Sequence, residues 1–169
     1  MILKEYPISD SFLKKIGLFS LAWGLFEYAY FENDANINKI LAMPIPTFAD
    51  NMADKIRGFR DKLIEFIKRN GDTVNEETVR KYFFTEKART IGLDNCLSFL
   101  NGYTDDFHNC LACIYRIRNN LLHGEKDIWK IEKEQEELFD AVLNILEPFV
   151  TWEQINNEFN RRFFEENPE

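Results

Sequence analysis

The residue types that could carry chemistry are concentrated in one string, Arg118-Asn119-Asn120-Leu121-Leu122-His123-Gly124. Histidine titrates near neutral pH and can transfer protons, and arginine makes forked contacts with phosphates. On a helix, Asn119 and His123 are four residues apart and share one face. Arg118 and His123 diverge by roughly 140° around the axis. Side-chain length, or a second copy across a two-fold axis, would therefore have to bring them together.

Arg118 occupies a helical position where an apolar residue is expected. The predicted helix opens at 104–106 and ends at Gly124, and its buried side would carry Phe107, Leu111, Ile114 and then position 118. A guanidinium keeps its proton, so burying it without a partner is costly. We expect Arg118 to pair with an internal acid, for which Glu27 is the candidate, or to face a cleft or a partner subunit. A purely structural Arg118–Glu27 pair, with His123 as a helix C-cap, is the alternative.

The three cysteines and the other histidine do not form a metal-binding pattern. Cys96, Cys110 and Cys113 are an odd number and are typical of small apolar core residues. No second pair accompanies Cys110-x-x-Cys113, and His108 lacks the spacing of a zinc ligand. We therefore expect no metal, no cofactor and no disulfide framework, and we assign His108 to packing or to the surface.

The charge distribution limits the partners that the chain can have. The net charge of −8 argues against indiscriminate binding of nucleic acid. Residues 54–69 nevertheless carry six basic and three acidic residues, and residues 132–147 carry six acidic residues and one basic residue. An acidic protein can still have a basic groove. Ordinary solvated helix faces would explain either run as well.

The hydrophobic pattern predicts helices along the whole chain. After possible caps at 9–11, a first seam follows the helical period and consists of Phe12, Ile16, Phe19, Trp23, Phe26 and Tyr30. A second stripe beside it consists of Leu18, Leu21, Leu25 and Tyr28. A helix that is apolar on two sides must be buried on two sides, either inside the bundle or at a subunit contact.

Further helices are predicted at 49–69, after a Thr73-x-x-Glu76 capping box, at 86–100 with an interruption at Gly92, at 128–147, and after Thr151-x-x-Gln154. With 169 residues, 45% of them hydrophobic, the chain fits one domain. We predict an all-α bundle of five to seven helices over residues 1–169, with an acidic tail at 165–169. The amino terminus shows no secretory signal, and the apolar stretch at 17–31 is too short and mixed for a membrane span, so we expect a cytoplasmic protein without membrane contact.

The Arg118-to-His123 string, followed by Gly124-Glu125, resembles the motif of the HEPN superfamily, in which an arginine and a polar residue precede a histidine. The resemblance is strongest over residues 107–127. It implies an HEPN-like helical bundle and a metal-independent endoribonuclease whose active site is formed by two protomers. His123 would then be the general acid or base, Arg118 would hold the phosphate, and Asn119 would orient His123 or the phosphate.

The resemblance also implies a product and a biological setting. RNA cleavage of this type leaves a 2′,3′-cyclic phosphate, which DNA cannot form without its 2′-hydroxyl. The resemblance implies a toxin or defence ribonuclease with RNA as its substrate. Its expected partners are a second copy of the chain and an antitoxin or regulatory protein. Some toxin members carry a tyrosine two residues after the histidine, where this chain has Glu125. Two alternatives stay open: a non-catalytic HEPN module that binds nucleotides or proteins, and a helical scaffold in which the motif is a coincidence.

Overall fold

Every regular element of the described structure is a helix. The computed structural model describes residues 9–84, 90–102, 106–122 and 134–161. Within these ranges the α-helices are α1 (Asp10–Phe31), α2 (Ile37–Ala42), α3 (Ala53–Arg69), α4 (Glu76–Phe83), α5 (Leu93–Leu100), α6 (Asp106–Leu122), α7 (Glu134–Leu146) and α8 (Trp152–Asn160), and single 3-10 turns cover Thr47–Asn51 and Glu147–Phe149. The predicted all-α class is confirmed. The described ranges hold eight α-helices, one more than the upper limit that we predicted, and α2 is the additional one.

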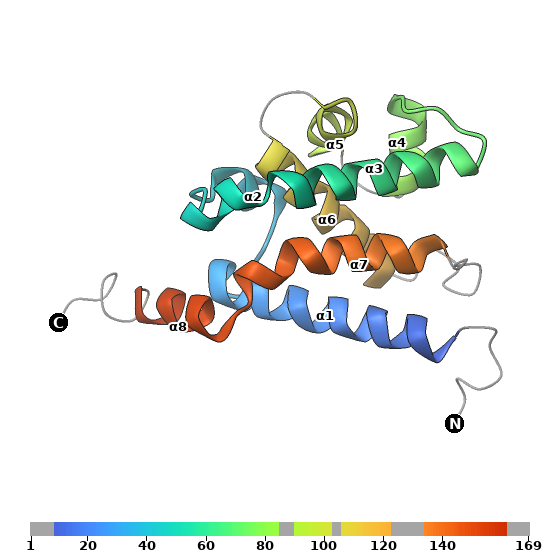
Figure 1. The fold of residues 1–169 in the computed structure, drawn as a ribbon. Coiled ribbons are helices and arrows are strands. Elements are labelled where there is room, and N and C mark those ends of the chain that lie inside the picture. Colours follow the sequence, from blue (N-terminus) through green and yellow to red (C-terminus); the bar gives the residue numbers. More distant parts are fainter. Residues whose placement is uncertain (1–8, 85–89, 103–105, 123–133, 162–169) are drawn as a thin grey trace.

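The helices pack in layers around α7 and α6. In Figure 1, α7 lies beside α1 and runs in the same direction, and α3 lies on the other side of α7. Helix α6 packs against α2, α3, α4 and α5, and it passes behind α7 in this view. Of the two helices that carry the predicted site residues, α6 is thus central to the bundle, whereas α1 lies at its edge, against α7 and α8.

The first seam of α1 forms the core as predicted. Ser9 caps the helix by accepting a hydrogen bond from the amide of Phe12. Four of the six predicted inward side chains are buried, with Phe19, Trp23 and Phe26 at 1% exposure or less, and Ile16 and Tyr30 are partly buried against the core. Four aromatic rings, those of Phe26, Tyr30, Phe48 and Phe107, contact Phe149 of the turn that follows α7. These ring contacts, three of them edge-on, join α1, α6 and the end of α7 into one core.

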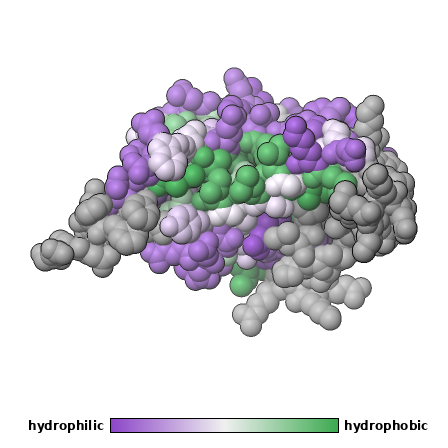
Figure 2. All heavy atoms as spheres, turned by 90° about the horizontal axis from the view of Figure 1, so that it is seen from below, coloured by the Kyte–Doolittle hydropathy of each residue, from purple (hydrophilic) through white to green (hydrophobic). Residues whose placement is uncertain are grey.

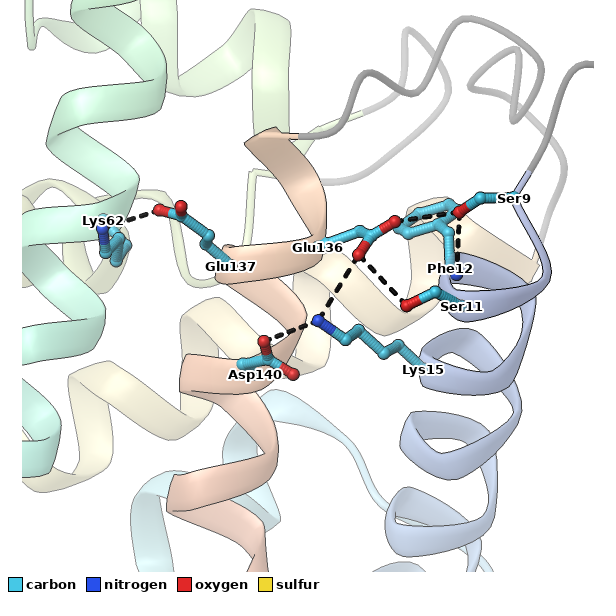
Figure 3. A network of polar contacts seen from close by, with 8 residues as sticks. All are labelled: Ser9, Ser11, Phe12, Lys15, Lys62, Glu136, Glu137 and Asp140. Carbon is cyan, nitrogen blue, oxygen red and sulfur yellow. Dashed lines mark hydrogen bonds and ion pairs between the residues drawn. The ribbon is translucent and has the colours of Figure 1, made fainter.

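A row of acids on α7 connects this helix to its two neighbours (Figure 3). Glu136 accepts hydrogen bonds from the hydroxyl groups of Ser9 and Ser11 at the start of α1. Asp140 pairs with Lys15 of α1 at 2.7 Å, and Glu137 pairs with Lys62 of α3 at 2.8 Å. Exposed pairs of this kind contribute little stability each. Together these contacts fix the register of α7 against α1 and α3.

Two local predictions are wrong. The cap of α4 is Asn75, which accepts a hydrogen bond from the amide of Thr78, and not Thr73, so this helix begins at Glu76. Helix α3 begins at Ala53 and not near position 49, because a 3-10 turn precedes it. The buried side of α3 ends in Ile67, and Phe66 is only partly buried and packs on Tyr82.

Several predictions fall on residues outside the described ranges. These are the start of the 86–100 helix, Gly124-Glu125, the first part of the 128–147 helix and the acidic tail at 165–169. In the described part, α5 begins directly after Gly92, whose φ of 87° suits glycine. Among the described helices, none has the length and apolar character that crossing a membrane requires.

Candidate functional site

Arg118 lies on the side of α6 that faces α1, and it pairs with the acid proposed for it from the sequence. Its Nη2 atom is 3.3 Å from Oε2 of Glu27, and the two side chains are 25% and 14% exposed. The residues before it on the same side of α6, Phe107, Leu111 and Ile114, are buried. The buried side of α6 thus continues to position 118 as predicted. There the guanidinium of Arg118 stands where an apolar side chain would be expected.

Glu27 is held by three donors that come from different parts of the chain. Its Oε2 atom accepts a hydrogen bond from the indole Nε1 of Trp23 at 3.1 Å, in addition to the contact with Arg118. Its Oε1 atom accepts from the backbone amide of Ala35 at 3.1 Å. Because Trp23 is only 1% exposed and is four residues before Glu27, the indole lies one turn away on the same face. The carboxylate therefore has little freedom to move.

The turn that ends α1 is built around the same residue. The amides of Glu32 and Asn33 both donate to the backbone carbonyl of Glu27, and both residues have positive φ, 54° and 62°. This left-handed ending reverses the chain and brings the amide of Ala35 back to the Glu27 carboxylate. Backbone and side chain of Glu27 together fix the end of α1 next to the last turns of α6.

Asn119 completes the described part of the site. Its Oδ1 atom accepts a hydrogen bond from Nη1 of Arg118 at 2.9 Å. The two outer nitrogens of the guanidinium are thus directed by Glu27 and by Asn119. The Nε atom of Arg118 is buried and has no hydrogen-bond partner within the described ranges. The following residue, Asn120, has a structural contact instead, since its amide donates to the backbone carbonyl of Tyr82.

Of the four predicted site residues, the structure brings three together. Arg118, Asn119 and Glu27 form one connected group of hydrogen bonds. The fourth, His123, lies outside the described residues, and so does the Gly124-Glu125 continuation of the motif. Chemically, the described group can hold an arginine in a fixed orientation at the end of α6 while a quarter of its side chain stays exposed.

Sequence reasoning missed one member of this group. Trp23 was assigned to the hydrophobic seam of α1, which its burial confirms, but its indole N–H also binds Glu27. The signal that could have revealed this role is the spacing. A tryptophan four residues before a buried acid on one helix can offer its single donor to that acid.

The other candidates are structural within the described ranges. Cys96, Cys110 and Cys113 are all buried, as predicted for core residues. Burial raises the pKa of the Cys110 and Cys113 thiols far above the ordinary value. His108 is buried too, and its Nε2 atom is 2.9 Å from the backbone carbonyl of Met43. Among the described residues no cluster of His, Cys, Asp and Glu could hold a metal ion.

The basic run of residues 54–69 does not form an unpaired cationic surface. Lys55 and Lys62 line a groove between α3 and α7, but acids of both helices line it too. In α3, Arg57 pairs with Asp54, Arg69 pairs with Glu65, and Lys62 reaches both Glu65 and Glu137. Hydrogen bonding to Lys62 also holds the pKa of the Glu137 carboxyl below its usual range. Much of the basic run is therefore matched by acids, which agrees with the interpretation as a solvated helix face.

Comparisons with known proteins give no match for this chain. No protein-family model matches it, and neither does any curated protein or any solved structure. Its function must therefore be inferred from its own residues and their geometry.

Proposed function

We propose that this chain is a metal-independent endoribonuclease of the HEPN type that acts as a homodimer, with Arg118, Asn119 and His123 at its active site. The proposal combines the motif in the sequence with the geometry around Arg118. The resemblance suggests a toxin or defence ribonuclease that an antitoxin or regulatory protein controls. RNA would be the substrate, and no cofactor would be required.

The observation that carries the proposal is the way in which Arg118 is held. A charge-assisted hydrogen bond between a guanidinium and a carboxylate is normally 2.7–2.9 Å long and often two-pronged. Here a single contact of 3.3 Å joins Arg118 to Glu27, and the side chain is 25% exposed. The guanidinium is therefore oriented without being enclosed, and the contact with Glu27 is weak enough to be exchanged for a phosphate oxygen.

The proposed reaction uses the ribose itself as the nucleophile. The 2′-hydroxyl attacks the adjacent phosphorus and loses its proton, and the 5′-oxygen of the next nucleotide leaves with a proton. A bond between the 2′-oxygen and phosphorus forms while the bond to the 5′-oxygen breaks, which gives a 2′,3′-cyclic phosphate and a 5′-hydroxyl. His123 would transfer one of these protons. Arg118 would stabilise the negative charge on the phosphate oxygens, and Asn119 would keep Arg118 or the phosphate in place.

The helical geometry of the motif supports a homodimer. Arg118 and His123 diverge by roughly 140° on a single helix. Two copies related by a two-fold axis near the ends of their α6 helices could place His123 of one copy next to Arg118 of the other. Isologous contacts of this kind are the usual arrangement of a homodimer. A monomer by light scattering at micromolar concentration would contradict this part of the proposal.

The decisive experiment is cleavage of total RNA by the purified protein in excess chelator, with mapping of the cut ends. We expect cyclic-phosphate ends from the parent protein and loss of cleavage in His123→Ala and in Arg118→Ala. Arg118→Lys should not restore cleavage, because an ammonium lacks the forked geometry. Arg57→Ala, which removes an exposed arginine of α3, is the matched control and should cleave normally. Parental rates in both site variants would refute the assignment, and so would a requirement for magnesium.

A non-catalytic HEPN module that binds a nucleotide or a protein is the second candidate. The observation in its favour is that both outer nitrogens of Arg118 already have partners, Glu27 and Asn119. In that case the protein should bind RNA or nucleotides without cleaving them. Arg118→Ala should then weaken binding, whereas His123→Ala should leave every measured property unchanged.

A further inference from the structure

The outer face of the bundle carries an apolar groove between α1 and α7. The groove has a volume of about 630 Å³, and its apolar lining includes Leu18, Leu21, Leu25 and Leu143. We call it the α1/α7 groove. Figure 2 shows this side of the molecule, with hydrophobic side chains gathered along the middle and hydrophilic ones on both sides of them. The leucines of α1 belong to the second apolar stripe predicted from the sequence.

The second stripe is not covered by the described part of the bundle. Leu18 is 45% exposed and Leu21 is 61% exposed. Contiguous exposed apolar surface of this kind typically marks a binding site.

The spacing of the lining residues suits a helix as the ligand. On α1, Leu18, Leu21 and Leu25 are spaced three and four residues apart and cover two turns. On α7, Asp140 and Glu147 are seven residues apart and line the other edge of the same groove. Since α1 and α7 run in parallel, the leucine edge and the acidic edge border a strip at least roughly 10 Å long. An amphipathic helix can place its apolar face in such a strip.

The acidic edge has little counter-charge of its own. No lysine or arginine occurs from position 134 to 147. Asp140 pairs with Lys15, but it stays 51% exposed, and Glu147 is exposed and forms no ion pair with any described residue. The opposite edge, on α1, is aliphatic. The groove is therefore asymmetric, apolar along one side and negatively charged along the other.

We propose that the α1/α7 groove binds an amphipathic helix of a partner protein whose apolar face is flanked, on one side only, by basic residues about two turns apart. Two basic side chains in that register would meet Asp140 and Glu147, while the apolar face covers Leu21 and its neighbours. Charge complementarity of this kind selects the partner and fixes its direction in the groove. The proposal does not depend on the ribonuclease activity.

A second copy of this chain fits the groove less well. Within α1 the only basic residues are Lys14 and Lys15, and Lys15 already contacts Glu136 and Asp140. A two-fold contact through this face would bring the acidic edge of each copy against leucines or against the acidic edge of the other. An anionic membrane surface is disfavoured by the same charges.

The test uses a synthetic helical peptide with leucines at the spacing of the groove and two lysines seven residues apart on one flank. Its binding to the full-length chain is followed by fluorescence anisotropy, and the same peptide with glutamates in place of the lysines is the control ligand. We expect the lysine peptide to bind at least tenfold more tightly, which corresponds to about 1.4 kcal/mol.

Two pairs of protein variants separate the apolar and the charged contributions. Leu21→Asp should abolish binding, while Ile45→Asp, at another exposed apolar position (56% exposed), should not. Glu147→Lys should weaken binding of the lysine peptide about tenfold and favour the glutamate peptide, while Asp61→Lys, an exposed acid of α3, should have no effect. Circular dichroism confirms that each variant is folded.

Each remaining outcome contradicts the proposal. Equal binding of both peptides, or no binding, would exclude a cationic helix as the ligand. If the parent is a dimer that Leu21→Asp converts to a monomer, and the peptide does not compete with dimerisation, the groove is a contact between copies. Binding of the chain to lipid vesicles that Leu21→Asp abolishes would identify a membrane surface instead.

Discussion

Glu27 and Arg118 form a pair, but removing one of them should cost more than removing the other. Glu27→Ala leaves three donors without their acceptor: the indole N–H of buried Trp23, the amide of Ala35 and the Arg118 guanidinium. Each unsatisfied buried donor costs about 1–3 kcal/mol, less where water can enter, so we expect Glu27→Ala to lower the free energy of unfolding by about 3–5 kcal/mol.

Arg118→Ala removes one of the three donors and leaves Glu27 with the other two. A fully buried pair that loses one partner costs about 3–5 kcal/mol, and an exposed pair costs about 0–1 kcal/mol. With side chains 25% and 14% exposed and a contact of 3.3 Å, this pair falls between those limits. We therefore expect a cost of about 1–2 kcal/mol for Arg118→Ala.

Urea unfolding followed by tryptophan fluorescence measures both changes, and a double-mutant cycle measures their coupling. In the Glu27→Ala background, Arg118→Ala should cost almost nothing, because the charge partner is already absent. Glu27→Gln, which keeps one acceptor, should fall between the parent and Glu27→Ala. A larger loss for Arg118→Ala than for Glu27→Ala, or full additivity in the cycle, would refute the view that Glu27 organises the site.

Three further predictions concern local features. The three buried cysteines should resist alkylation in the native protein and react fully in urea, because burial raises the pKa of two of these thiols; mass spectrometry of alkylated protein checks this. The hydrogen bond from Ser9 lowers the pKa of Glu136 below its ordinary 4.5, so the charged form stabilises the fold above that pH and the benefit is lost as the pH falls through the lowered value. The stability difference between the parent and Glu136→Gln, measured by urea unfolding at several pH values, should therefore shrink in acid. Asn75→Ala should cost about 1 kcal/mol by removing the cap of α4, and Thr73→Ala should cost less; equal thermal melting of the two variants would contradict the assigned cap.

The sequence predicted the pairing of Arg118 with Glu27 because the physical constraint is strict. A permanently charged side chain on the buried side of a helix needs an opposite charge, and Glu27 is the only acid within the apolar stretch of α1. The aromatic seam of α1 was predictable for a similar reason, since six side chains repeat with the helical period and only one face can hold them. Charge and periodicity in a single sequence can thus predict a contact between residues far apart in the chain and the buried face of a helix.

Short helices, and the choice between two neighbouring residues that could each cap a helix, were not predictable in the same way. Helix α2 has six residues, which is less than two turns, so no periodic signal distinguishes it from a loop. For α4, Thr73 and Asn75 are both good caps, and only the observed hydrogen bond to Thr78 decides between them. The fate of the second apolar stripe of α1 was also open, because periodicity shows that a face is apolar but not what covers it.

The parallel pairing of α1 with α7 has a consequence for the way in which the chain folds. Ser9 and Glu136, which touch in the native state, are 127 residues apart, so the ribosome must synthesise most of the chain before α1 meets its neighbour. Until then the part of the first seam of α1 that packs on Phe139 of α7, namely Phe12 and Phe19, is uncovered in the nascent chain. Contacts of such large sequence separation slow folding and leave hydrophobic segments open to aggregation. Nascent chains that end before residue 134 should therefore depend on chaperones, whereas addition of α7 should release them.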